Sequence, residues 1–409
     1  MDYNRYNYNQ FENDIPIPNT PLFERPDYLT STSDGAIKVA VLDTGIDLDH
    51  DSLRAYIYRN ELESVLANGI DEDNNCLIDD WAGWNYVDNN NNPNDDHSHG
   101  THVAGIIVDN LKIHGVPSCD FKIIPYKTHD YHGFSTLYDV ACATYQALED
   151  EASVINDSWG FYGDPSIILQ NAIDTAKLFN VLVVSAAGND TIALNGMPQY
   201  PACYNIPNVL TVGSYITVID PNGSLDTMIS GFSNYDPECV DILAEGENIT
   251  SAVLNNQFDM KSGTSMAAPA VSAAAVIAYC EGHNDYLEVK QNILVCADKY
   301  LIFQNVALDG NVLNYNFPCI TPVEEIDLED NDFIVYPNPF SDQLTISNLQ
   351  IKEAVTLKII STLGTTLYEK QIDFWYENEQ INLPSLPAGV YWVRIQSGNK
   401  YWSYKIIKL

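Results

Sequence analysis

Basic residues are scarce in this chain of 409 residues, which has 19 lysines and arginines against 56 aspartates and glutamates and a net charge of −37. Proteins that bind nucleic acid neutralise its phosphates with basic side chains, so this balance argues against a nucleic-acid partner. Long apolar runs are missing as well. The longest, around Ser272–Cys280, is too short to cross a bilayer, so we expect no transmembrane segment.

The first residues lack the apolar core of a signal peptide, because Met1–Tyr6 is polar. Residues 1–35 also carry four prolines, which interrupt regular structure and predict an extended arm on the surface. We therefore expect that the printed sequence is truncated or that its start is wrongly placed.

The acidity divides the chain into modules. Residues 333–409 hold 7 basic and 6 acidic residues, whereas the remainder holds 12 and 50. The strongly acidic stretch 320–332 between them predicts an extended linker. All eight cysteines fall within residues 36–319. In a module of this size both disulfides and free buried thiols are compatible with that count, and spacing does not give a pairing.

Residues 36–319 alternate short apolar strands with helical patterns, which predicts an α/β fold with a doubly wound parallel sheet. Strands are expected at 38–42 and 181–185, and a helix at 167–179. Another helix is expected after Ser135, which we assign as its N-cap.

Three short segments carry an aspartate, a histidine and a serine in that order. Asp43 follows a buried strand, His99 opens a helical pattern, and Ser265 precedes a helix of small residues. A serine hydroxyl is a weak nucleophile until a neighbouring base takes its proton, and a third group must hold that base in the right tautomer. The same imidazole, with His97 and His102, also has the composition of a metal site, but no His-Glu-x-x-His pattern supports that alternative.

The segments Val41–Gly45, His99–Gly105 and Gly263–Pro269 together resemble the signature of the subtilisin-like serine proteases. The resemblance implies that Ser265 is the nucleophile, His99 the general base and Asp43 the group that orients it. In the same pattern His102 is a packed, hydrogen-bonded residue of the helix.

Two further segments extend the resemblance. The first, after the strand at 181–185, resembles the family's oxyanion-hole segment, with Asn189 as the side-chain donor. The second resembles the substrate-binding edge strand, which pairs with an extended peptide. The residues expected to bind substrate are Ser158, Trp159, Gly160, Ala186, Ala187 and Gly188.

Between Asp43 and His99, oxygen-bearing residues recur at alternate positions, as Ca²⁺ ligands do. The glycine and the closing glutamate of an EF-hand are missing, so the pattern is only half met. A structural calcium ion is the preferred interpretation and a solvated acidic loop is the alternative; no organic cofactor is expected. The candidate ligands are Asp71, Asp73, Asn75, the carbonyl of Leu77, and Asp80 or Asp79.

Residues 333–409 show period-2 alternation separated by turns, which predicts a small all-β sandwich. The opening Tyr336–Pro339, the segment Leu386–Tyr391 and the basic, apolar end Lys405–Leu409 resemble the C-terminal sorting domain of type IX secretion substrates of Bacteroidetes. A carbohydrate-binding or adhesive module is the alternative. The resemblance implies the secretion machinery as a partner and an extracellular or surface-attached location.

Taken together, the patterns predict a secreted or cell-surface serine endopeptidase that acts on protein or peptide substrates. A dedicated processing protease for one partner and an inactive protease-like scaffold that displays the last module remain as alternatives. The space before Asp43 is also too short for the inhibitory propeptide that many members of the family carry.

Overall fold

The computed structural model describes residues 35–63, 68–115, 119–219, 225–315, 334–347, 355–361, 366–372, 378–383, 386–397 and 400–409. The chain divides into two compact units, Met1–Cys319 and Ile320–Leu409. The expected arm over residues 1–34 and the expected linker over 320–332 lie outside the described residues.

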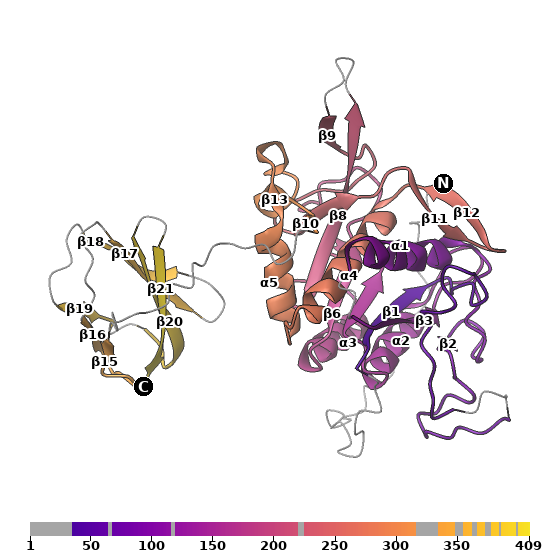
Figure 1. Ribbon diagram of the computed structural model, residues 1–409, viewed down its shortest axis with the longest axis horizontal. Helices are drawn as coiled ribbons and strands as arrows, with labels where there is room; N and C mark the ends of the chain where they lie inside the picture. The colour runs from indigo at the N-terminus through magenta and orange to yellow at the C-terminus, as the bar shows by residue number, and fades with distance from the viewer. Residues whose placement is uncertain are drawn as a thin grey trace. The chain divides into compact units, whose positions relative to one another are not determined.

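A ten-stranded sheet forms the centre of the first unit (Figure 1). Its order is β13-β14-β10-β8-β6-β4-β1-β3-β2, with β9 paired to β8. The pairs from β14 to β2 are parallel, whereas β13–β14 and β8–β9 are antiparallel. The strands are β1 Ile37–Asp43, β2 Trp84–Asn85, β3 Phe121–Lys127, β4 Val154–Asp157, β6 Leu182–Ala186, β8 Val209–Ile219, β9 Leu225–Ile229, β10 Ile242–Glu245, β13 Asp298–Lys299 and β14 Asn311–Val312.

Helices cover both faces of this sheet, because its strands are apolar on both sides. In β1, Val39 and Val41 share one core with α1, α4 and α5, while Ala40 and Leu42 share the other with α2 and α3. This arrangement confirms the predicted doubly wound α/β fold. The helices are α1 His99–His114, α2 Leu137–Glu149, α3 Ile167–Leu178, α4 Thr264–Cys280 and α5 Tyr286–Cys296.

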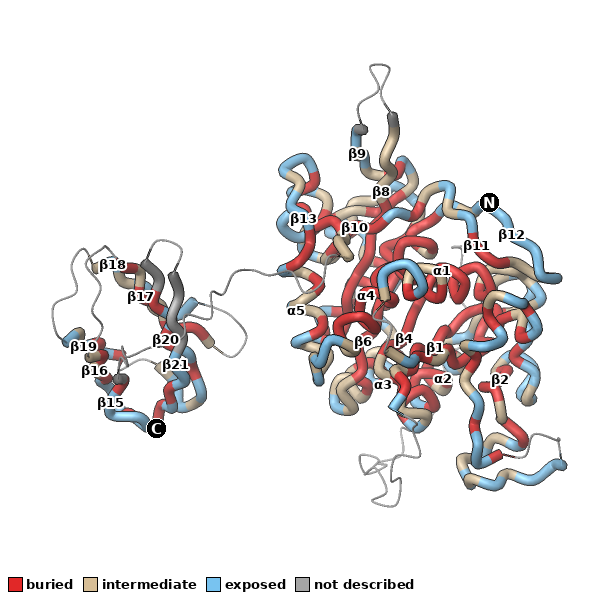
Figure 2. The backbone as a smooth tube through the Cα atoms, in the orientation of Figure 1, coloured by how far each residue is buried: buried red, intermediate tan, exposed pale blue. Residues whose placement is uncertain are grey.

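Helix α4 is almost entirely buried, as its red tube in Figure 2 shows. Its alanines let it pack closely against α1 and the sheet.

The expected N-cap of helix α2 was wrong by one residue. Thr136, not Ser135, accepts the hydrogen bond from the Asp139 N–H. Thr136 has the extended backbone that this cap position requires, and its hydroxyl also donates to Asp139 Oδ2 at 2.7 Å.

Two small antiparallel strand pairs lie outside the main sheet. Strands β11 Ile249–Val253 and β12 Gln257–Lys261 pair with each other shortly before Ser265. Strands β5 Phe161–Tyr162 and β7 Gln199–Tyr200 pair on the carboxyl side of β4. Short 3₁₀ turns span Leu301–Phe303 and Leu308–Gly310.

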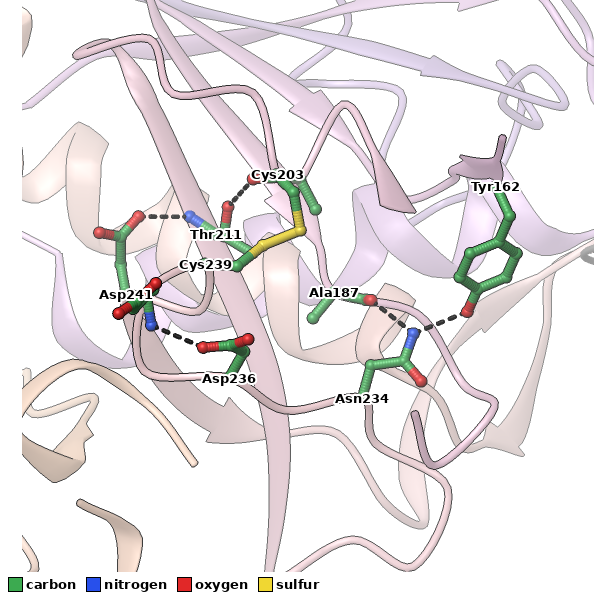
Figure 3. Close-up of a disulfide and its surroundings, with 10 residues drawn as sticks. Tyr162, Ala187, Cys203, Thr211, Asn234, Asp236, Cys239 and Asp241 are labelled. Carbon is green, nitrogen blue, oxygen red and sulfur yellow. Dashed lines mark hydrogen bonds between the residues drawn. A yellow bond between two sulfur atoms is a disulfide. The ribbon is translucent and has the colours of Figure 1, made fainter. Parts of the chain in front are cut away.

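Disulfides decide the question that the cysteine count left open. Cys119 pairs with Cys280, with a Cα–Cα distance of 5.6 Å. Cys203 pairs with Cys239, with a Cα–Cα distance of 5.2 Å (Figure 3). Cys76 and Cys142 are free. Disulfides form and persist mainly in oxidising compartments.

The second unit consists of two antiparallel sheets that share one apolar core. Inward-facing Leu344 and Ile346 of the first sheet contact the same core as Leu357 and Val393 of the second. The predicted small all-β sandwich is therefore confirmed. The first sheet has the order β15 Ile334–Tyr336, β16 Gln343–Ser347, β19 Asn378–Asn382, and the second the order β18 Thr366–Ile372, β17 Val355–Ser361, β20 Gly389–Ser397, β21 Lys400–Lys408.

A search of the described residues finds no helix with both the length and the apolar composition needed to cross a membrane.

Candidate active site

The predicted catalytic segments meet at the carboxyl edge of the main sheet. Strand β1 ends at Asp43 and α1 begins at His99, while α4 begins next to Ser265. The two flanking parallel strands, β4 and β6, end just before Ser158 and Ala187. Open α/β sheets place their ligands at this edge, so the fold positions these side chains where chemistry is expected.

Asp43 and His99 are in direct contact at this edge. Asp43 Oδ1 lies 2.7 Å from His99 Nδ1 and also accepts the Thr44 N–H at 2.7 Å. Burial of Asp43 would raise its pKa, but the interaction and hydrogen bond with His99 outweigh it, and the pKa lies below its usual value. A carboxylate only accepts, so Nδ1 is the donor and Nε2 is left to accept a proton.

Asp95 holds the start of α1 in place. Its Oδ1 accepts the N–H groups of His97 and Ser98 and the Thr44 hydroxyl, and its Oδ2 accepts the N–H and hydroxyl of Thr101. Thr44 Oγ1 in turn accepts the Gly100 N–H at 3.0 Å. These bonds tie the first turn of α1 directly to the end of β1 and so fix His99 against Asp43.

Ser265 is tied to the end of β4 by two hydrogen bonds. Its hydroxyl donates to the Ser158 carbonyl at 2.9 Å, and the Ser158 hydroxyl donates to the Ser265 carbonyl at 2.9 Å. Among the described residues, the Ser265 hydroxyl makes no hydrogen bond with His99. Lys261, four residues earlier, donates to the carbonyl and hydroxyl of Ser98 and so links this segment to the start of α1.

The carboxamide of Asn189 is oriented by Thr264. Asn189 Oδ1 accepts the Thr264 N–H at 2.8 Å and the Thr264 hydroxyl at 3.0 Å, and that hydroxyl also accepts the Gly188 N–H. The oxygen of the amide is thereby satisfied. The amide nitrogen has no partner within the described part of the chain, so it is free to donate to a bound substrate.

Buried Asn234 braces the loop that carries Asn189 (Figure 3). Its Nδ2 donates to Tyr162 Oη at 2.7 Å and to the Ala187 carbonyl at 2.8 Å. Its Oδ1 accepts the N–H groups of Asp190 and Ile192. Every hydrogen-bonding position of this buried amide is thus used to hold the loop.

The expected peptide-binding residues form two neighbouring segments, 158–160 after β4 and 186–188 at the end of β6. The description of the first as an edge strand needs correction. Strand β4 is internal, between β1 and β6, and residues 158–160 extend beyond the sheet. The rings of Trp159 and His129 lie 5.7 Å apart beside this extension.

His102 is buried and its Nε2 lies 3.1 Å from the Ile249 carbonyl and 3.2 Å from the Asp259 carbonyl. Burial lowers the pKa of His102 to about 4, so it is neutral at pH 7. The groups of side chains in the described residues that have the geometry to hold a metal do not include His97, His99 or His102. The metal alternative at these histidines therefore gains no support.

The acidic loop before β2 brings carboxylates together around Glu63. One group joins Glu63 with Asp71 and Asp73, and another joins it with Glu72 and Asp79, with ligand oxygens within 4.8 Å of one another in each. Glu63 Oε2 is buried without a hydrogen-bond partner. Burial raises the pKa of Asp73 and of Glu63, and neighbouring acids raise both further.

The other predicted ligands of this loop take different partners. Asn75 Nδ2 donates to Asp73 and to Asp80, at 3.2 and 3.0 Å, so Asp80 contacts the cluster through an amide. Burial raises the pKa of Asp80 to about 7. The Leu77 N–H donates to Asn75 Oδ1. Of the two groups of carboxylates, the one of Glu63, Asp71 and Asp73 contains two of the predicted ligands.

The sequence patterns did not single out Asp95, Asn234 and Glu63. Asp95 lies four residues before His99, the first residue of α1, whose N-cap is Ser98. Asn234 and Glu63 act on segments far from them in the sequence, and no local pattern marks them.

Comparison with known proteins agrees with this geometry. The model of the subtilase family matches residues 34–305, and that of the secretion system C-terminal sorting domain matches residues 334–409. Subtilisin-like protease 1 of Plasmodium berghei (strain Anka) is 32% identical over 272 residues, covering 63% of this chain and 45% of that protein. The thermophilic serine proteinase of Bacillus sp. (strain AK1) is 31% identical over 282 residues, covering 68% and 61%.

The crystal structure of a cold-adapted subtilisin-like serine proteinase superposes with a TM-score of 0.53 at 26% identity, covering 69% of this chain and 90% of that one. The chain spans about half the length of the two curated relatives.

Proposed function

Because this chain belongs to the subtilase family, we propose that it is a serine endopeptidase whose catalytic residues are Asp43, His99, Ser265 and Asn189. The observation that carries the proposal is the 2.7 Å contact between Asp43 and His99, at the same sheet edge as Ser265 and the free amide of Asn189. A nucleophile, a base, an orienting acid and an oxyanion donor are the groups that acyl transfer needs.

In the proposed reaction, Ser265 Oγ attacks the substrate carbonyl carbon while its proton passes to His99 Nε2. Rotation of the hydroxyl away from the Ser158 carbonyl is required, and catalytic hydrogen bonds are often made only once substrate is bound. The oxyanion accepts the Asn189 amide and the Ser265 N–H. His99 then gives its proton to the leaving amine. Water attacks the acyl-enzyme next, while His99 takes its proton and returns that proton to Ser265 Oγ as the acid product leaves.

Substrate is proposed to bind as an extended peptide along Ser158, Trp159 and Gly160, opposite the segment Ala186–Gly188. In this mode of peptide binding, main-chain hydrogen bonds give affinity, and pockets for alternate side chains give selectivity.

A structural calcium ion is proposed in the acidic loop, with Glu63, Asp71 and Asp73 as its first ligands. The buried, partnerless Glu63 oxygen and the raised pKa of Asp73 support this, because a cation would neutralise carboxylates that otherwise repel one another. Bound there, the ion would hold the loop in one conformation.

The location is proposed to be extracellular or on the cell surface, by way of type IX secretion machinery that recognises residues 333–409. The sorting-domain match and the two disulfides support this. Deleting residues 333–409 from the gene in a bacterium with that machinery is expected to retain the protein inside the cell envelope; unchanged export would contradict it.

The peptidase proposal is tested by casein hydrolysis. We expect the purified wild-type chain to degrade casein and Ser265→Ala to have no activity above background. Equal activity in the two proteins would reject the proposal, and an absence of activity in both would favour an inactive scaffold.

A further inference from the structure

Ser98, the residue directly before the proposed base, has a backbone conformation that serine rarely adopts. Its φ is 80° and its ψ is 0°, in the left-handed region. The Cβ atom of an L-residue is crowded there, so a residue other than glycine stays in this region only when its surroundings hold it. Ser98 occupies the N-cap position of α1, yet its side chain makes no capping hydrogen bond to the helix. Its conformation therefore depends on other side chains.

Two charged side chains hold Ser98 from different directions. Asp95 Oδ1 accepts the Ser98 N–H at 2.9 Å. Lys261 Nζ donates to the Ser98 carbonyl at 3.1 Å and to its hydroxyl at 2.7 Å. Asp95 belongs to the same loop, whereas Lys261 is 163 residues further along the chain, at the end of β12. Lys261 thus connects the start of α1 to a distant element.

The strand pair that carries Lys261 is fixed against α1. Nε2 of the buried His102 contacts two carbonyls of β11 and β12, and the Ser251 hydroxyl donates to the His102 carbonyl at 2.8 Å. A Cβ atom added to Gly105 would lie 2.2 Å from Ser251 Oγ, so the helix and β11 are in close contact. The β11–β12 pair therefore cannot move along α1 without breaking these contacts, and it offers Lys261 a fixed base.

The ammonium of Lys261 has a specific partner rather than a counter-ion. Among the described residues, it donates only to Ser98 and forms no ion pair with a carboxylate. Burial lowers the pKa of Lys261, while the nearby Asp95, Asp43 and Asp259 act in the opposite direction. Replacing this lysine by an apolar residue would therefore leave no paired carboxylate behind. The Ser98 carbonyl would keep the His102 N–H, which donates to it at 3.3 Å.

We propose that Lys261 is a positioning residue of the reaction, which holds Ser98 in the left-handed conformation and so directs the His99 imidazole toward Ser265. The inference rests on the proposed peptidase function. Ser98 and His99 are neighbours, so a rotation about the backbone of Ser98 reorients the imidazole. Lys261 also lies four residues before Ser265 in the chain, so this one side chain ties the segment of the nucleophile to that of the base. A displacement of about 1 Å at a reacting group can cost about 10²-fold in rate.

The test is a cycle of variants of the full chain, with kcat and KM measured on one quenched fluorescent peptide. Lys261→Met keeps the apolar stem and removes the donors, so kcat is expected to fall by about 10²-fold while KM stays within about 2-fold. Lys261→Arg keeps a charged donor that can reach both oxygens of Ser98, and it should recover most of the loss.

Ser98→Gly decides how Lys261 acts, because glycine adopts a φ of 80° without crowding of a Cβ atom. In that background Lys261→Met should lower kcat by less than about 10-fold. In the Ser98→Ala background, which keeps the Cβ atom, the loss should remain near 10²-fold, about as in the wild type. An equal loss in the Ser98→Gly background and in the wild type overturns the inference, because the charge of Lys261 would then act on the site directly.

Lys112→Met is the matched control. This lysine also donates to a backbone carbonyl, that of Ser52 at 3.3 Å, but from the last turn of α1, and its kcat should equal that of the wild type. Rates are measured well below the lowest melting temperature, and Lys261→Gln, which offers a single neutral group, replaces Lys261→Met in the cycle if that variant does not fold.

Two other outcomes also overturn the inference. A raised KM at constant kcat in Lys261→Met would assign the lysine to substrate binding. A lowered melting temperature at constant kcat and KM would assign it to stability alone. Both leave the peptidase function intact, whereas cleavage that survives Ser265→Ala overturns the proposed function itself.

Discussion

The carboxyl edge of the sheet and the acidic loop before β2 are both dense in polar side chains, yet only in the loop do several carboxylates lie side by side. At the edge, the carboxylates accept hydrogen bonds. Asp43 accepts them from His99 and Thr44, and Asp95 accepts them from five N–H and O–H groups. In the loop, Glu63 lies with Asp71 and Asp73 in one cluster of acids.

The two regions therefore differ in what stabilises their conformations. The edge is organised by the ends of strands and helices, whose backbone groups need partners in any case. The described part of the loop has neither helix nor strand. Its carboxylates accept backbone N–H groups, as those of Glu63 and Asp71 do, but they also lie next to one another, and we propose that a cation stabilises them. Changes at the edge should therefore alter turnover at constant stability, whereas changes in the loop should alter stability at constant turnover.

The largest effect is expected from His99→Ala, which removes the base from an intact edge. A loss of about 10⁶-fold in kcat is expected, the magnitude found for triad removal in a subtilisin, with the melting temperature nearly unchanged. Peptide hydrolysis and thermal unfolding measure the two quantities. His283→Ala, beyond the far end of α4, serves as the control and should keep full activity.

Asn189→Ala and Asn234→Ala test whether the loop of β6 acts as one unit. Each is expected to lower kcat, Asn189→Ala by about 10²–10³-fold as measured for the same donor in a subtilisin, with little change in KM. Because Asn234 acts through the loop that carries Asn189, the double variant should be hardly slower than Asn189→Ala alone. Fully additive losses would show that Asn234 serves stability only.

Calcium removal tests the opposite half of the comparison. With EGTA we expect the melting temperature to fall by about 5 °C, because a ligand that binds only the folded state at about 100 times its Kd stabilises by about 2.7 kcal/mol. Initial rates well below the melting temperature should stay constant. Asp73→Asn should abolish the EGTA effect, whereas Asp88→Asn in the neighbouring polar loop should preserve it. An identical melting temperature with and without EGTA would favour a solvated loop.

A smaller effect is expected from acid. Burial lowers the pKa of His129 to about 4, while an unfolded histidine titrates near 6.5. Between these values unfolding takes up a proton, so this residue makes stability fall as the pH drops from 6.5 to 4 and contributes no slope above 6.5. His129→Gln should reduce the slope of the free energy of unfolding against pH in that window, by at most the slope that the uptake of one proton produces. An unaltered slope would mean that another group carries it.

Much of the edge could be predicted because each residue stands at an element boundary that the sequence marks. Asp43 ends a run of buried apolar residues, and Ser265 lies in the first turn of a helix of alanines. The alternation that predicts strands also predicted both sheets of the C-terminal sandwich. Local pattern and final position agree here since neighbouring residues determine both.

The remaining features depend on residues that meet only after folding. The carboxylates of Glu63 and Asp71 lie in one cluster, and the carboxamide of Gln199 lies next to Gly188. The disulfide Cys119–Cys280 closes a separation of 161 residues. No spacing rule relates such pairs, because the path between them is set by the whole core. The same reason hid the roles of Asp95 and Asn234.

The most direct test of the central claim is the rate at which a fluorophosphonate forms an adduct with the intact chain, followed by mass spectrometry of its peptides. The account predicts a single adduct on Ser265 in the wild type, none in Ser265→Ala, and labelling at least about 10³-fold slower in His99→Ala. Labelling of Ser265 at the wild-type rate without His99 would contradict it.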